Sequence, residues 1–218
     1  MRRLLMFITL ALLLTSTWLA FTVGEVVPSE DEKGVTVEKN ILYVHVPSAI
    51  CSTLCFLVLL LTSIAYLVNS KPIFDYIGAA SAEAALVFTT VLNLTGCIFS
   101  RVFWGPWWTP TPRLLTSAIL WFLAVAYLIL RAGIQNQRHR ARLCAVFGII
   151  AFIDVPMVFI SARMMRDMHP ANVGFDTAWQ GVSFGLSVLS ILSLAALFIW
   201  LRTDILRSRA QLENEMYS

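Results

Sequence analysis

The run VPSAICSTLCFLVLLLTSIAYLVN, residues 46–69, decides the fold, because its 24 residues include no charged side chain. About 20 predominantly apolar residues are enough for a helix to cross a bilayer. Runs of the same kind occupy about 4–23, 76–99, 114–130, 143–162 and 178–201. We therefore predict an all-α integral membrane protein with six transmembrane helices, which form a single transmembrane domain over residues 1–218.

The overall composition points the same way. The chain of 218 residues is 58% hydrophobic and 13% charged, whereas average proteins are roughly 45–50% apolar and about 25% charged. Its mean hydropathy is +0.77, and a net charge of +3 is too small for a phosphate-binding surface. These values exclude a soluble enzyme domain, a disordered protein and a nucleic-acid binder, and they predict that membrane lipid surrounds the chain.

The first apolar run follows Met1-Arg2-Arg3, as the core of a secretory signal would. It is longer than the usual ~7–15-residue signal core, and no clear small-x-small cleavage site follows it. We therefore expect a retained signal anchor.

Lysine and arginine in the short loops set the orientation of the spans, because cytoplasmic loops carry an excess of these residues. Ten of them fall in one set of alternating segments and six in the other. The ten are Arg2, Arg3, Lys71, Arg131, Arg138, Arg140, Arg142, Arg202, Arg207 and Arg209. This bias predicts that both termini are cytoplasmic and that segments 24–45, 100–113 and 163–177 form the outer loops.

The outer segment 100–113, SRVFWGPWWTPTPR, concentrates three indoles, Trp104, Trp107 and Trp108, beside three prolines. Proline removes a backbone donor and clashes with the preceding helical turn, so we expect a rigid loop rather than a continuing transmembrane helix. One interpretation is an aromatic belt, since tryptophan is enriched where headgroups meet hydrocarbon. The other is a flat platform for a planar apolar ligand with carboxylates, which Arg101 and Arg113 would hold by charge-assisted hydrogen bonds.

Two of the three histidines, His45 and His169, lie in the predicted outer segments. Each one alone is typical of a headgroup contact. As a pair on one membrane face, they could supply both axial ligands of a haem iron, because neutral imidazole is a common nitrogen ligand. The predicted spans contain no histidine, which argues against a haem held inside the bundle. An outer bis-histidine site instead suits a haem that is held briefly and passed on.

Two carboxylates, Glu83 and Asp154, fall well inside predicted spans, where charged side chains are costly and are functional candidates by default. No basic residue is expected at a matching depth to pair with either. We favour a structural role for both, as protonated groups hydrogen-bonded across a helix interface. Asp154 could also lie beside carbonyls that Pro156 leaves without a donor. The cysteines within the spans are expected to behave as small hydrophobic residues, and they are Cys51, Cys55, Cys97 and Cys144.

Three stretches of this chain resemble the haem exporter protein C family (CcmC) of cytochrome c maturation, over about residues 40–200. Residues 42–49, LYVHVPSA, are similar to the Tyr-x-His-Val-Pro segment of that family. Thr95-Gly96, followed by Trp104-Gly105-Pro106-Trp107-Trp108, resembles its Trp-rich motif, and residues 154–169 resemble the segment that leads to its second histidine. Two departures reduce the expected platform and its contact with a partner: Pro110-Thr111 stands where the family usually has Trp-Asp, and Met164-Met165 replaces a tryptophan pair.

This resemblance implies that the chain binds haem b transiently at the outer, periplasmic face of a bacterial inner membrane and delivers it to a haem chaperone similar to CcmE. His45 and His169 would be the axial ligands of the iron. The other cofactor-binding residues would be Trp104, Gly105, Trp107, Trp108, Arg101 and Arg113. ABC transporter subunits similar to CcmA and CcmB and a small accessory membrane subunit are the further partners implied.

The resemblance implies haem binding and transfer rather than catalysis. Two alternatives stay open at this stage. A stand-alone cytochrome c haem lyase of the related synthase type would ordinarily need more spans and a soluble domain. A small-molecule membrane transporter would be supported by paired broken spans around a midplane site, and Pro156 with Asp154 is the one hint of such a site in the sequence.

Overall fold

A computed structural model describes residues 2–22, 40–164, 175 and 177–217 of the chain. The helices are α1 (Arg2–Thr22), α3 (Leu42–Asn69), α4 (Pro72–Trp104), α5 (Pro112–Gly133), α6 (Gln137–Ala151), α7 (Asp154–Met164) and α8 (Ala178–Tyr217). Five of these helices are each long and apolar enough to cross a bilayer, and α6 and α7 contribute a sixth span, Gln137–Ser161. The prediction of an all-helical chain with six membrane spans is therefore confirmed for the described residues.

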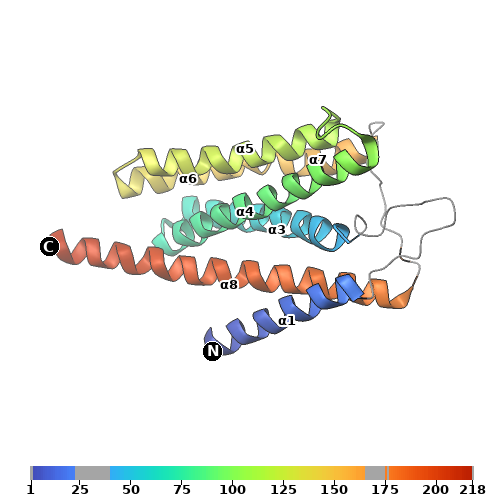
Figure 1. Ribbon diagram of the computed structural model, residues 1–218. Coiled ribbons are helices and arrows are strands. Elements are labelled where there is room, and N and C mark those ends of the chain that lie inside the picture. The colour runs from blue at the N-terminus through green and yellow to red at the C-terminus, as the bar shows by residue number, and fades with distance from the viewer. Residues whose placement is uncertain (1, 23–39, 165–174, 176, 218) are drawn as a thin grey trace.

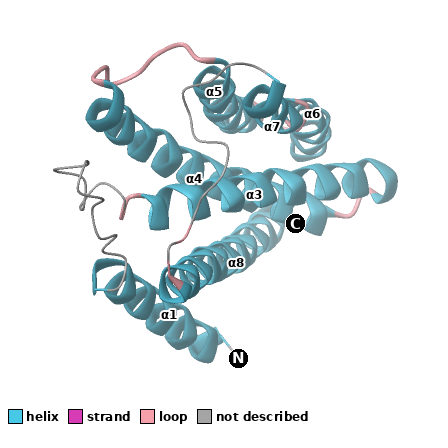
Figure 2. Ribbon diagram, turned by 90° about the vertical axis from the view of Figure 1, so that its right-hand side faces the viewer, coloured by secondary structure: helices cyan, strands magenta, loops and turns pink. Residues whose placement is uncertain are grey.

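Figure 1 shows both chain termini at the same end of the bundle, as an even number of spans requires. We call this the terminal end, and we call the opposite end, where α3 begins and α4 ends, the distal end. Helices α3 and α4 lie in the middle of the bundle, with α5, α6 and α7 on one side and α8 and α1 on the other (Figures 1 and 2). Helix α3 contacts α4, α6 and α8, whereas α1 packs chiefly on α8.

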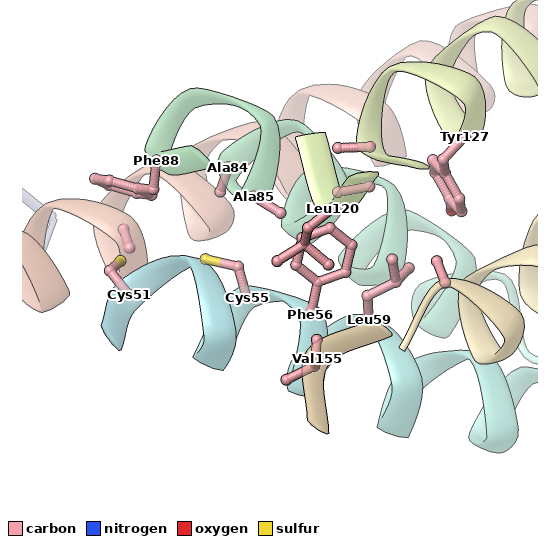
Figure 3. Packing of buried hydrophobic residues seen from close by; sticks show 14 of the residues in the cluster. Cys51, Cys55, Phe56, Leu59, Ala84, Ala85, Phe88, Leu120, Tyr127 and Val155 are labelled. Carbon is pink, nitrogen blue, oxygen red and sulfur yellow. The ribbon is translucent and has the colours of Figure 1, made fainter. Parts of the chain in front are cut away.

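The buried core lies where α3 meets α4, α5 and the broken fifth span. Figure 3 shows Phe56 of α3 beside Leu120 of α5 and Val155 of α7, and all three belong to one buried cluster. Lipid tails are as apolar as these side chains, so close packing rather than escape from water holds such a cluster together. Tight fit between the helices is therefore the main source of stability.

Small residues let the central helices approach each other closely. Helix α4, which packs against α3, α5 and α8, carries the buried residues Ala79, Ala80, Ala82, Ala84 and Ala85. A Cβ atom on Gly148 of α6 would lie 2.7 Å from the Ser63 Oγ and 3.1 Å from the Leu59 side chain, both on α3. Larger residues at these positions would force the helices apart, which is the usual reason for small residues at membrane helix interfaces.

The fifth span is broken between α6 and α7 by Pro156. Proline has no N–H to donate to the carbonyl of residue 152, and its ring clashes with that carbonyl. The Ile153 N–H donates instead to the Ile150 carbonyl at 3.0 Å, in a tightened turn. The Asp154 Oδ2 is buried beside this break and has no hydrogen-bond partner among the described residues.

Ion pairs join the helices in the half of the bundle nearer the terminal end. Arg131 of α5 donates two hydrogen bonds to the carboxylate of Asp75 on α4, at 2.7 and 2.8 Å. The exposed fractions of the two side chains are 12% and 4%. Arg2 of α1 pairs with Asp204 of α8 near the surface.

The expectation that Glu83 lacks a basic partner is wrong. Arg202 of α8 donates from Nε and from its terminal nitrogen to the two Glu83 oxygens, at 2.5 and 2.8 Å. A long arginine side chain can extend along apolar surface to reach a group deeper in the membrane, so residue count along a span underestimates its reach. Glu83 does link two helices, as expected for a structural role, but it does so in an ion pair.

We predict that Asp75→Asn destabilises the bundle strongly. The loss should be about 3–5 kcal/mol, because Arg131 would keep an uncompensated charge in a buried position. Asp204→Asn, at the exposed pair with Arg2, is the matched control and should cost less than about 1 kcal/mol. Thermal unfolding in detergent micelles measures both variants, and equal losses would contradict the structural role of the buried pair.

Candidate functional site

His45 lies in the first turn of α3, at the distal end of the bundle. It was expected in the outer segment 24–45, but α3 begins at Leu42 rather than at residue 46, so His45 is helical. The His45 N–H donates to the Ile41 carbonyl at 2.8 Å, in the first turn. Pro47 is the sixth residue of α3, and it has no N–H to donate to the Tyr43 carbonyl four residues earlier.

The His45 side chain is held against α4 by a specific hydrogen bond. Its Nδ1 lies 2.9 Å from the Thr95 Oγ1. The single proton of the Thr95 hydroxyl is directed to the carbonyls of Val91 and Leu92, at 2.7 and 3.1 Å. The hydroxyl oxygen therefore accepts, and Nδ1 of the imidazole donates. This assignment follows from the hydrogen-bond network, and it places the lone pair of the neutral ring on Nε2.

Gly96 makes this approach possible. A Cβ atom at this position would lie 3.3 Å from the His45 Cε1, tighter than ordinary van der Waals contact. Thr95 and Gly96 thus act together: Thr95 accepts a hydrogen bond from the imidazole of His45, and Gly96 leaves room for that ring. A histidine that donates one nitrogen to a fixed acceptor has its tautomer and ring orientation set, which is how proteins prepare a metal-binding imidazole.

The predicted loop 100–113 is shorter in the structure, because α4 continues to Trp104 and α5 already begins at Pro112. Trp104 is therefore a helical residue rather than a loop residue, and Arg113 lies in the first turn of α5. The prolines do end the helix, but they act only on the residues at and just before them. Gly105, with a φ of +92°, turns the chain out of α4 immediately before Pro106.

Polar contacts fold the loop back along α4. The buried Ser100 hydroxyl donates to the Pro106 carbonyl at 2.9 Å. Arg101 donates to the Gly105 carbonyl, and its guanidinium lies over the Trp107 ring at 5.9 Å from the centroid. Ser100 is five residues beyond Thr95, about 7.5 Å along the helix axis at 1.5 Å per residue. The tryptophan loop is thereby held close to the level of His45.

The three indoles have different surroundings. Trp104 packs edge-on against Phe99, one turn earlier on α4, with ring centroids 5.7 Å apart. Trp107 and Trp108 keep exposed fractions of 62% and 42%. Two large apolar rings are thus presented at the distal end on a turn that Ser100 and Arg101 hold in place.

The structure places His45, Arg101 and the three tryptophans at the distal end, with Arg101 against Trp107, and it places Arg113 in the first turn of α5. His169, Met165 and Arg166 lie outside the described residues, as do residues 23–39 of the first predicted outer segment. Thr95 entered the sequence-based interpretation only as part of the resemblance to a Trp-rich motif, and Ser100 and Phe99 did not enter it. The four-residue spacing of Thr95 and Phe99, about one helical turn, was a signal that could have indicated Phe99.

The chain matches the haem exporter protein C family over residues 1–216. It is 28% identical to the haem exporter protein C of Bradyrhizobium diazoefficiens over 193 residues, which cover 84% of this chain and 72% of that protein. It is 27% identical to a putative cytochrome c biosynthesis ccmC-like mitochondrial protein of Marchantia polymorpha, over 77% of this chain and 67% of that protein. The haem exporter protein C of Escherichia coli K12 is 26% identical over 61% of this chain and 54% of its own length.

A match over nearly the whole chain, together with six apolar helices that gather a histidine and a tryptophan-rich turn at one end, leads to one conclusion: this protein belongs to the haem exporter protein C (CcmC) family of cytochrome c biogenesis.

Proposed function

We propose that this protein binds haem as cargo at its distal end and passes it to a haem chaperone similar to CcmE. In this proposal His45 and His169 ligate the iron, and Trp104, Trp107 and Trp108 form the apolar platform. The distal end faces the periplasm of a bacterial inner membrane, so both termini are cytoplasmic. ABC transporter subunits similar to CcmA and CcmB and a small accessory membrane subunit are the proposed partners.

The observation that carries this proposal is the hydrogen bond between the His45 Nδ1 and the Thr95 Oγ1 at 2.9 Å. A headgroup contact would not need a set tautomer, whereas an iron ligand does, because the metal takes the lone pair of the other ring nitrogen. The acceptor is itself fixed by two backbone carbonyls of α4. The imidazole is thus oriented before any ligand arrives.

The tryptophan-rich turn supports the same proposal. A porphyrin is a planar aromatic group, and indole faces pack on such rings in offset or edge-on geometry. An added Cβ on Gly105 would have no neighbouring atom within 4 Å. Gly105 therefore serves the turn through its positive φ rather than by leaving room for a close contact. The Arg101 guanidinium lies over the Trp107 ring, and its position beside the tryptophans supports a role in holding a haem propionate.

The protein contributes binding, orientation and electrostatics, and the redox chemistry belongs to the iron. No covalent step on haem is proposed for this chain. A site at the water-facing end of the bundle, rather than within it, suits a cargo that has to leave again.

We predict that His45→Ala combined with His169→Ala abolishes most haem binding. Removing both imidazoles would leave the iron without axial nitrogen ligands from the protein. The test is the Soret absorbance of purified protein after haem loading in detergent. Wild-type and double-variant spectra of equal intensity would show that the ligand assignment is wrong.

Thr95→Val should weaken haem binding roughly 10- to 100-fold, the usual effect of losing the group that orients a metal-binding histidine. Thr95→Ser keeps the hydroxyl and should bind haem as the wild type does. Haem titrations followed at the Soret band measure both. If the valine variant binds with wild-type affinity, His45 is not prepared as a ligand by Thr95.

Substitution of Trp107 tests whether the tryptophans form a ligand platform or an aromatic belt. Trp107→Ala should weaken haem binding about 3- to 10-fold, since an aromatic contact contributes roughly 0.5–1.5 kcal/mol beyond area burial. Trp18 of α1 is the matched control, because it is equally exposed, at 63%, but lies away from the tryptophan turn. Trp18→Ala should leave haem affinity unchanged, and equal effects of the two substitutions would favour the belt.

A further inference from the structure

A cavity of about 700 Å³ lies between α1, α3, α4 and α8, in the half of the bundle nearer the distal end. Sites for cofactor-sized ligands usually measure about 300–1,000 Å³ and are mostly apolar. The walls are formed by side chains such as Leu13 of α1, Phe88 and Val91 of α4, and Ile191 of α8. This is more space than helix packing of the kind seen around α3 and α4 leaves open.

Helix α1 forms the outer wall of the cavity. It is joined to α8 by polar contacts between Thr9 and Ser193, at 2.6 Å, and between Ser16 and Ser190, at 3.1 Å. Several residues around the cavity also have side chains that are largely exposed on the lipid-facing surface of the bundle, among them Phe21 and Ile98. The cavity therefore lies next to the lipid-facing surface of the bundle.

Two polar groups within this apolar space have no hydrogen-bond partner among the described residues. Ser48 of α3 lines the cavity, its side chain is only 1% exposed, and its Oγ makes no hydrogen bond. The Asn40 Oδ1, at the distal mouth of the cavity, is also buried without a partner. A buried polar atom without a partner costs free energy, and a ligand with polar atoms of its own would satisfy both of these groups.

The cavity borders the proposed haem site, because it shares two residues with the contacts that position His45 and Trp104. Thr95, which orients His45, is one of its lining residues. Phe99, which packs on Trp104, is another. A ligand within the cavity would thus touch the two residues that position the first histidine and the first tryptophan.

We infer that this cavity is a lateral access route, through which haem dissolved in the outer half of the bilayer passes between α1 and α4 to reach His45. The inference rests on the proposed function, and it adds the direction from which the cargo arrives. The apolar face of the porphyrin crosses the apolar walls, and its polar propionates interact with Ser48 and Asn40 on the way to the water-facing mouth. A lipid acyl chain would fill the walls equally well but would leave both polar groups unpaired.

The test narrows the cavity without touching the site itself. Ala20 of α1 is buried and lines the cavity, so Ala20→Phe places a ring in the route. Ala11, on the same helix, is exposed and does not line it, so Ala11→Phe is the matched control. Haem is supplied to protein in nanodiscs by two routes, either dissolved in donor lipid vesicles or carried in water by a soluble haem-binding protein.

We expect Ala20→Phe to slow loading from vesicles roughly tenfold, because an added ring in a narrow space has to be displaced. Loading from water and the final Soret intensity should match the wild type, and Ala11→Phe should behave as the wild type by both routes. Ser48→Ala is a milder second variant that removes one polar group, and it should also slow loading from vesicles alone.

The outcomes separate the two proposals. If the wild type takes up no haem by either route, the proposed function fails. If the wild type loads but Ala20→Phe and Ser48→Ala both load from vesicles at the wild-type rate, the lateral route is overturned and haem binding stands. If either variant slows loading equally by both routes, the cavity is not a separate path from the bilayer, and the inference is again overturned.

Discussion

Hydrocarbon offers no hydrogen-bonding partner, and every polar group in this bundle is placed under that constraint. Threonine and serine side chains within the spans donate back to carbonyls of their own helices, as Thr62 and Thr89 do. Charges are taken up in pairs, and Asp75 with Arg131 and Glu83 with Arg202 each link two helices in the part of the bundle nearer the terminal end. The described residues of the distal end include a histidine, three tryptophans and small polar side chains.

The same constraint explains how an imidazole side chain is positioned at a membrane boundary. The Thr95 hydroxyl would be costly to bury alone, so it donates to its own helix, and its oxygen then accepts from His45. The Thr95 hydroxyl thus forms a hydrogen bond with the backbone of α4 and also positions His45 on the neighbouring helix α3. Ser100 acts in a comparable way one turn later, where its hydroxyl holds the Pro106 carbonyl and with it the tryptophan turn. The same side chains therefore satisfy hydrogen bonds of the backbone and position the residues of the site.

The proposed function and the lateral route describe one cargo that changes its surroundings. Haem has an apolar ring and charged propionates, so neither hydrocarbon nor water solvates the whole molecule well. A cavity with apolar walls and two unpaired polar atoms leads from the lipid side toward an oriented histidine and an exposed aromatic turn.

The sequence alone determined the number and approximate position of the spans, because apolar runs of about 20 residues have few alternatives in a bilayer. It also indicated the histidine and tryptophan positions through their residue types and spacing. It misjudged features that depend on contacts between helices: the partner of Glu83, the extension of α4 to Trp104 and the inclusion of His45 in α3. The acceptor for His45 and the cavity beside it arise where α3 and α4 meet, 50 residues apart in the chain. Hydrophobicity is a property of each residue by itself. The partner that Arg202 reaches, the tautomer of His45 and the volume of the cavity depend instead on which side chains the packed helices bring into contact.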